Sequence, residues 1–108
     1  MQQRLIPATA LAALEQVEPP FLSLFRHGSL EVEIYRPVGI DEQKPHRRDE
    51  VYVVIAGHGE FVCGDARQAF EPGEVLFVPA GVVHRFEHFS ADFSTWVFFY
   101  GPDGGETP

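Results

Sequence analysis

Residues 45–57 read PHRRDEVYVVIAG, and residues 73–88 read GEVLFVPAGVVHRFEH. The first stretch is typical of a β-strand that ends at a glycine turn, because β-branched residues and a tyrosine fill positions 51–55. Side chains alternate between the two faces of a strand, so we expect His46, Glu50, Tyr52 and Val54 to share one face. A carboxylate at the mouth of an apolar strand is costly to bury alone, so Glu50 requires a partner.

The second stretch predicts a tight turn, a buried strand, a Pro-Gly loop and another strand that starts at His84. On that last strand His84, Phe86 and His88 are expected to share one face, with Arg85 and Glu87 on the other. An inward imidazole beside Phe86 needs a hydrogen-bond partner or a metal ion. Both stretches therefore bring chemically active side chains to the inner face of a sheet.

Short runs of aromatic and β-branched residues also flank these two stretches, with turn residues between them. No segment between the runs is long enough for the crossover helix of a parallel sheet, so the chain after residue 20 is predicted to be all-β. Residues 30–35 alternate apolar and acidic side chains, as a half-buried strand does. Eight short strands at even spacing suit a closed barrel or a two-sheet jelly roll. The predicted strands are 21–25, 30–35, 51–55, 60–63, 67–70, 75–78, 84–89 and 93–100.

The sequence predicts one domain with short segments at both ends. Residues 1–20 are expected to form an N-terminal helical segment, opened by Pro7 or Thr9, with Ala10, Leu11, Leu14 and Val17 on one side. Residues 21–101 form the β-barrel. Residues 102–108 are rich in Gly, Pro and acidic residues without an apolar anchor, which predicts a flexible tail.

Charge and cysteine content limit the possible partners. Among 108 residues there are 8 basic and 16 acidic side chains, which give a formal net charge of −8. This balance argues against nucleic acid or an anionic membrane and favours a small molecule, a cation or a protein. The apolar stretch 6–14 is far shorter than the roughly 20 residues of a membrane span. The single cysteine, Cys63, cannot form an internal disulfide, so a cytoplasmic setting is expected.

The two quoted stretches resemble the motifs of the cupin superfamily, small β-barrels of the jelly-roll or double-stranded β-helix type. His46, Glu50 and Gly57 match the second His, the Glu and the last Gly of the first family motif. In the second motif, matches fall at Gly73, Pro79, Gly81 and His84. The resemblance implies a small single-domain cupin with a conserved-barrel core.

The sequence also departs from the family pattern. Lys44 occupies the slot of the first family histidine, and a protonated amine has no lone pair for a metal. Gln43 is one residue earlier, and its amide oxygen is an alternative ligand if the chain is kinked before Pro45. His88 occupies the slot of the final family Asn. It is interpreted as a fourth ligand, a group that supports the ligands, or an acid/base in the pocket.

The resemblance implies a divalent metal ion held by His46, Glu50 and His84, with Gln43 as a further candidate. Two imidazoles and one carboxylate suit non-haem Fe(II), which is favoured, and also suit Zn, Mn or Ni. His88 or Tyr52 is the candidate to move a proton. Tyr52 as a core residue with its hydroxyl at the barrel mouth is the alternative. The resemblance also implies a homodimer.

Three functions remain open at this stage. The first is an enzyme in which the metal activates dioxygen or polarises a carbonyl of a small organic molecule, with dioxygenase- or isomerase-like activity. The second is a non-enzymatic barrel that binds a sugar or an organic acid. The third is a metal-free barrel that serves oligomerisation, which Lys44 at a ligand slot supports.

Other polar residues have simpler interpretations. His27 and His58 lie in glycine turns and are expected to be exposed. Cys63 is interpreted as a small buried hydrophobe rather than a thiolate. Arg47 and Arg48 are typical of a solvated loop, or of a clamp for a substrate carboxylate at the barrel mouth.

Overall fold

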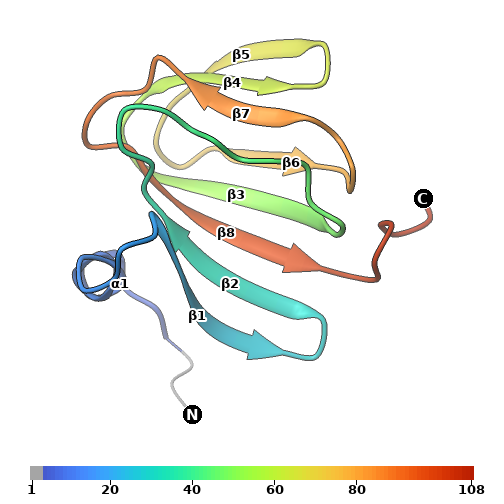
Figure 1. The fold of residues 1–108 in the computed structure, drawn as a ribbon, viewed down its shortest axis with the longest axis horizontal. Coiled ribbons are helices and arrows are strands. Elements are labelled where there is room, and N and C mark those ends of the chain that lie inside the picture. Colours follow the sequence, from blue (N-terminus) through green and yellow to red (C-terminus); the bar gives the residue numbers. More distant parts are fainter. Residues whose placement is uncertain (1–3) are drawn as a thin grey trace.

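The computed structural model describes residues 4–108 and contains two antiparallel sheets that face each other (Figure 1). The larger sheet has the strand order β1-β2-β8-β3-β6, and the smaller has the order β5-β4-β7. This arrangement confirms the predicted jelly-roll barrel. The elements are α1 (Pro7–Leu14), β1 (Phe21–His27), β2 (Leu30–Tyr35), β3 (Asp49–Ala56), β4 (Gly59–Cys63), β5 (Ala66–Phe70), β6 (Val75–Val78), β7 (His84–Glu87) and β8 (Ser94–Tyr100).

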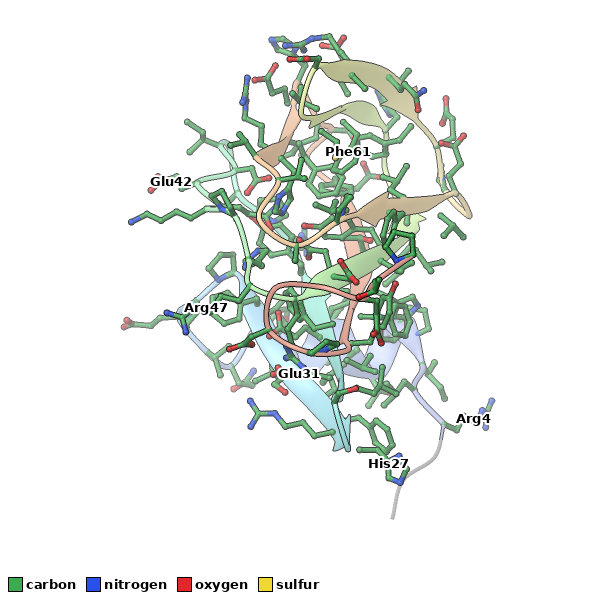
Figure 2. All side chains as sticks on the ribbon, turned by 90° about the vertical axis from the view of Figure 1, so that its right-hand side faces the viewer. Arg4, His27, Glu31, Glu42, Arg47 and Phe61 are labelled. Atoms are coloured by element: carbon green, nitrogen blue, oxygen red, sulfur yellow. The ribbon has the colours of Figure 1, made fainter. Side chains whose placement is uncertain are left out.

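The main core lies between the two sheets and is rich in aromatic rings. Phe86 on β7 is at its centre, with its ring centroid 4.6 Å from that of Phe93 and 4.9 Å from that of Tyr52. Phe61 on β4 lies beside them inside the barrel (Figure 2). Edge-to-face and tilted ring pairs of this kind add stability beyond the area they bury. The core therefore fixes the position of β7, which carries His84, against the larger sheet.

A second, smaller core lies on the outer face of the larger sheet, under the helix. The helix starts at Pro7, whose fixed φ suits the first helical position. Ala10 and Leu14 are buried against Ile34 of β2, whereas Val17 lies beyond the helix and is 38% exposed. Within residues 4–108, no helix is long and apolar enough to cross a membrane.

Strand β2 therefore buries side chains on both faces. Val32 and Ile34 face outward toward the helix side, and Tyr35 joins the main core. Glu31 and Glu33 share the face of Tyr35 and line a pocket beside the main core. The acidic face of this strand is thus turned toward the barrel interior and not simply toward bulk water.

The predicted flexible tail, residues 102–108, makes polar contacts with the barrel. The backbone N–H of Gly104 donates to the carbonyl oxygen of Arg47 (2.7 Å), and the N–H of Glu106 donates to Asp49 Oδ2 (2.8 Å). These two hydrogen bonds hold the tail to the barrel although it has no apolar anchor. The tail consequently lies beside the loop that leads into β3.

Candidate metal centre

The two sequence stretches that suggested a site lie side by side in the fold. Glu50 on β3 is directly opposite Val78 on β6. The N–H of Gly81, in the loop after β6, donates to the carbonyl oxygen of His46 (2.8 Å). Gly81 has a φ of +80°, a conformation that L side chains rarely adopt, so the loop turns tightly here. These contacts bring the start of β3 and the start of β7 to the same end of the barrel.

Glu50 is completely buried and its carboxylate has no hydrogen-bond partner among the described residues. The side chain points into the barrel from β3 and has 0% exposure. Neither Oε1 nor Oε2 meets hydrogen-bond geometry with another group. A buried carboxylate without such partners carries a large desolvation cost. A cation at this position would offset that cost.

His84 begins β7 and presents one ring nitrogen to Glu50. Its Nδ1–H donates to the carbonyl oxygen of Val82 (2.9 Å), so in the neutral ring Nε2 carries the lone pair. Nε2 lies 2.8 Å from Glu50 Oε1, but the two atoms are not aligned as a hydrogen bond. Burial lowers the pKa of His84, whereas Glu50 and the Val82 carbonyl raise it, and the net shift is upward.

His46 lies in the loop before β3 and closes the group from the pocket side. Its Nε2 is 3.7 Å from Glu50 Oε1, and its side chain is 34% exposed. The pKa of His46 is lowered, because burial and the neighbouring His84 outweigh the attraction of Glu50. The ring also packs edge-on against Phe99, with centroids 5.1 Å apart. A neutral imidazole in a fixed orientation is the form that binds a metal.

Ligand atoms of His46, Glu50 and His84 all lie within 4.8 Å of one another. Nitrogen and oxygen ligands bind divalent metals at about 2.0–2.2 Å, so ligands of one ion lie up to about 4.4 Å apart. Only a small movement of these three side chains is therefore required for all of them to bind one ion. The donor set of two imidazoles and one carboxylate fits a divalent transition metal, and the unpartnered Glu50 oxygens and His84 Nε2 supply the reason to bind one.

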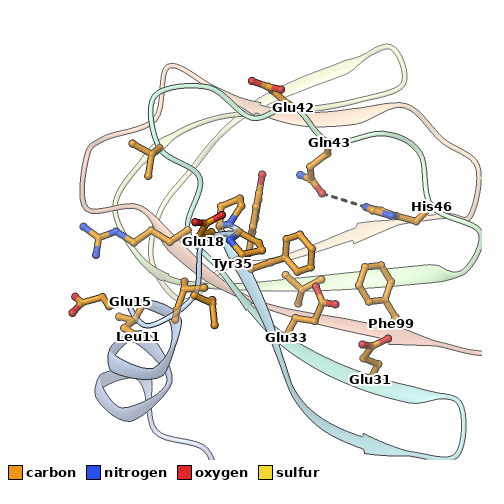
Figure 3. Close-up of a pocket in the computed structure, with 18 of the residues that line it drawn as sticks. Leu11, Glu15, Glu18, Glu31, Glu33, Tyr35, Glu42, Gln43, His46 and Phe99 are labelled. Atoms are coloured by element: carbon orange, nitrogen blue, oxygen red, sulfur yellow. Dashed lines mark hydrogen bonds between the residues drawn. The ribbon is translucent and has the colours of Figure 1, made fainter.

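Gln43 also reaches this group. Its Oε1 accepts a hydrogen bond from the Tyr52 hydroxyl (2.9 Å) and lies 3.3 Å from His46 Nε2 (Figure 3). Its Nε2 donates to Asp41 Oδ2 (2.8 Å), which directs the amide oxygen toward the histidine. The carbonyl oxygen has a second lone pair available for a metal. The structure thus brings Gln43 to the centre, whereas Lys44 is exposed.

Sequence reasoning missed Asp41, which holds this part of the site. Asp41 is buried and accepts hydrogen bonds from the hydroxyl of Tyr35 (2.5 Å) and the backbone N–H of Phe86 (2.8 Å). It also accepts the backbone N–H of Gln43 (3.1 Å). Bonding from an Asp side chain to the backbone two residues later is a recognisable turn signal, and that spacing was the available clue.

Neither of the two predicted proton carriers is among the residues that line the pocket. Tyr52 is fully buried and its hydroxyl orients Gln43, so the alternative of a core tyrosine describes it. For His88 the predicted shared face with His84 is wrong. Strand β7 ends at Glu87, because His88 has a φ of +51°, and its side chain is 78% exposed and pairs with Glu60 (2.7 Å). The left-handed turn redirects the side chain outward.

A pocket of about 920 Å³ opens beside the centre. His46 and Gln43 line it next to the centre, Phe99 lies beside His46, and Glu33 lies further along the wall (Figure 3). Residues of α1 and the loop after β2 complete the wall. This volume suits a small organic molecule, which would meet the candidate metal through the His46 end.

The remaining polar residues have structural positions. His27 and His58 are exposed, as expected. Arg48 pairs with Glu31 (3.0 Å) and lies over the Phe99 ring, whereas Arg47 is 88% exposed at the rim. Cys63 is partly buried against the main core. Burial and the charge of Glu50 raise the pKa of its thiol, so it is not a ready thiolate.

Comparison with known proteins gives the family. A family model for the Cupin domain matches residues 31–99, so the chain belongs to the cupin family. An uncharacterized protein of Streptomyces coelicolor, SCO3923, is 38% identical over 85 residues, which cover 77% of this chain and 81% of the relative.

Solved structures show the same fold at lower identity. A cupin superfamily protein from Desulfitobacterium hafniense is 18% identical with a TM-score of 0.64, and the match covers 94% of each chain. A Cupin 2 conserved barrel domain protein from Salinispora arenicola is 19% identical with a TM-score of 0.62, covering 75% of this chain and 74% of that one. The DMSP lyase DddQ from Ruegeria pomeroyi is 24% identical with a TM-score of 0.65 over 75% of this chain. The match covers only 46% of the lyase, so this likeness concerns the barrel alone.

Proposed function

We propose that this cupin binds a divalent metal ion through His46, Glu50 and His84, with Gln43 as a fourth ligand. The supporting observation is the buried carboxylate of Glu50, whose two oxygens have no hydrogen-bond partner in residues 4–108 and whose Oε1 lies 2.8 Å from His84 Nε2. Fe(II) is the favoured ion, because two histidines and one carboxylate are its usual donor set when coordination positions stay open for a substrate. Zn, Mn and Ni suit the same donors.

The proposed role of the metal is to bind and polarise a small organic molecule in the adjoining pocket. A bound divalent ion supplies a Lewis acid at the inner end of that pocket. His46 belongs to the centre and also lines the pocket, and its neutral ring packs against Phe99. Gln43 is held by Asp41 and Tyr52, so Tyr52 acts as a positioning residue. In its enzymatic form this function is a dioxygenase- or isomerase-like activity.

A non-enzymatic barrel that binds a sugar or an organic acid is the second candidate. It is favoured by one observation: His88 and Tyr52, the predicted proton carriers, are not among the residues that line the pocket. Oxygen uptake and product formation by Fe(II)-loaded protein with a substrate panel separate the two candidates. Turnover with any member supports the enzyme, whereas saturable binding without turnover supports the binding barrel.

Metal content tests the common part of the proposal. Protein without an affinity tag is loaded with Fe(II) under anaerobic conditions, or with Zn²⁺, and its metal is measured by elemental analysis after gel filtration. Wild type and the control His58→Ala are expected to carry about one equivalent, since His58 is exposed and is not one of the three residues of the cluster. His84→Ala is expected to lose most of it. Equal content in His84→Ala and His58→Ala would refute the centre.

The predicted homodimer and cytoplasmic setting remain part of the proposal. Support for the dimer comes from the outer face of the larger sheet, where Val75 and Phe77 on β6 are 65% and 50% exposed. Val51 lies opposite Phe77 and extends this apolar face. Light scattering of wild type and Phe77→Asp is expected to give a dimer and a monomer, respectively. A wild-type monomer at micromolar concentration would contradict the dimer.

A further inference from the structure

The pocket has a second polar end, formed by Glu33. Glu33 on β2 is directly opposite Val97 on β8, and Val97 is directly opposite Tyr52 on β3. In the neighbouring row, Glu31 is opposite Phe99, and Phe99 is opposite Glu50. Directly opposed residues point to the same face of a sheet, so Glu33 and Glu50 face the same side from strands two apart.

This register sets the distance between the two polar ends. Two interstrand spacings of 4.7–4.9 Å place the backbones of β2 and β3 about 10 Å apart. The side chains of Val97 and Phe99 on β8 lie between them and line the same pocket. A ligand that extends from the metal centre across this apolar strip therefore reaches Glu33 after a few carbon atoms.

Glu33 also has no cationic partner in the described part of the chain. The nearby guanidinium groups of Arg26 and Arg48 pair with Glu31 instead, at 2.9 Å and 3.0 Å. Burial, followed by the negative charges of Glu31 and Glu50, raises the pKa of Glu33 to about 7. A half-buried carboxylate that has no cationic partner is stabilised in its ionised form when a positively charged group binds it.

The charges of the pocket indicate the class of ligand. Five carboxylates line it, from Glu15, Glu18, Glu31, Glu33 and Glu42, against three guanidinium groups, from Arg36, Arg47 and Arg48. The excess of carboxylates over guanidinium groups therefore favours a cationic group in this pocket. At the metal end a divalent ion with a single carboxylate ligand keeps a positive charge and favours an anionic oxygen donor.

We propose that Glu33 is the specificity residue of this site and binds the ammonium group of a small aliphatic amino carboxylate, whose carboxylate faces the metal. This inference rests on the proposed function, because the orientation of the ligand requires the metal centre. It adds the substrate class: a zwitterion with a short apolar chain between its charges, which lies along Val97 and Phe99.

Calorimetric titration of the Zn²⁺-loaded protein at pH 8 tests the inference. The probes are 4-aminobutyrate, 5-aminopentanoate and 6-aminohexanoate, each compared with the carboxylate of equal chain length that lacks the amine. Wild type is expected to bind at least one amino compound about tenfold more tightly than its partner, the size expected for a charge-assisted hydrogen bond. Glu33→Gln is expected to abolish this ratio while it keeps its zinc and its affinity for the plain carboxylate.

Glu71→Gln is the matched control, because Glu71 is an exposed carboxylate in the turn between β5 and β6 and does not line the pocket. It removes the same charge and is expected to keep the ratio. The inference is overturned if Glu33→Gln retains the wild-type ratio, if no chain length shows a preference, or if no probe binds to the zinc-loaded protein. Failure of the metal centre itself is recognised separately, since wild type and His84→Ala would then hold equal zinc.

Discussion

The Nε2 atom of His84 and the Oε1 atom of Glu50 lie 2.8 Å apart, although β7 and β3 belong to different sheets. The contact joins the smaller sheet to the larger one at the end where the pocket opens. A proton on His84 neutralises the buried carboxylate, which agrees with the raised pKa of the imidazole. A metal ion can bind His84 Nε2 only after this proton has left. The proton and the metal ion therefore compete for the same position.

Removal of the metal is expected to lower the melting temperature. A metal that binds only the folded state stabilises it by about 2.7 kcal/mol when the free ion is at 100 times its Kd. For a domain of this size the loss corresponds to roughly 10 °C or more. Scanning calorimetry with and without EDTA measures the shift. His84→Ala is expected to melt at the same temperature in both buffers, and an EDTA shift of wild-type size in this variant would contradict the assignment.

Replacement of Gln43 is expected to weaken metal binding. Gln43→Ala removes the amide oxygen that lies 3.3 Å from His46 Nε2, and a loss of about 10–100-fold in affinity is expected. Competition with a chromophoric chelator measures the Kd. Lys44→Ala is the control, because Lys44 occupies the neighbouring position but is exposed. Equal affinities for the two variants would exclude Gln43 from the centre.

The strands and their approximate ends were predictable, because local chemistry decides them. Gly57 ends the β3 region with a φ of +89°, and Pro79 and Gly81 form the loop between β6 and β7. His46, Glu50 and His84 converge as the motif spacing suggested. The alternation of side chains between the two faces of a strand predicted their direction correctly wherever the strand continued in regular geometry.

Other parts of the site depend on tertiary contacts that alternation does not contain. His88 lies outside because one residue adopts a positive φ, which is uncommon for residues other than glycine. Glu33 faces the pocket because α1 covers the opposite side of β2, and this makes the apolar face of that strand the outer one. The orientation of Gln43 depends on Asp41, which also binds the backbone of Phe86 far along the chain. Partners so far apart along the chain cannot be recognised from the local sequence pattern.

Loss of the Asp41 carboxylate is expected to destabilise the whole barrel. Asp41→Ala leaves the buried hydroxyl of Tyr35 and the N–H of Phe86 without acceptors, at a cost of about 1–3 kcal/mol each. Urea unfolding of the metal-free protein is expected to show a loss of about 3 kcal/mol or more. Glu42→Ala, one residue away and exposed, should remain within about 0.5 kcal/mol of wild type. Similar losses in both variants would contradict the role of Asp41.

Gly57 is expected to tolerate no side chain. A Cβ there would lie 2.5 Å from Phe93 Cα and 2.8 Å from its backbone nitrogen, so backbone atoms must move. Gly28 has a similar positive φ but no atom within 4 Å of a Cβ, so it isolates the cost of conformation alone. Gly28→Ala is expected to cost about 1 kcal/mol and Gly57→Ala at least 2 kcal/mol more in urea unfolding. Equal costs would show that the close approach to Phe93 is unimportant.

Glu33→Gln is expected to make the metal-free protein more stable, and only at higher pH. The pKa of Glu33 is about 7 in the folded protein against 4.5 as its ordinary value, so the folded state holds the proton more tightly. The resulting stability is fully present below pH 4.5 and is lost as the pH rises through about 7.

The size of this effect follows from the two pKa values. Each pKa unit of difference between the folded and unfolded states corresponds to about 1.4 kcal/mol in the free energy of unfolding. Partial exposure of the side chain reduces the total effect to roughly 1–2 kcal/mol. Urea unfolding at pH 5 and pH 8 is expected to show similar free energies of unfolding for wild type and Glu33→Gln at pH 5, and a more stable variant at pH 8. Glu42→Gln is expected to show no such pH-dependent gain. A difference between Glu33→Gln and wild type that is the same at both pH values would contradict the raised pKa, because ionisation of the Glu33 carboxyl is the titration that the variant lacks.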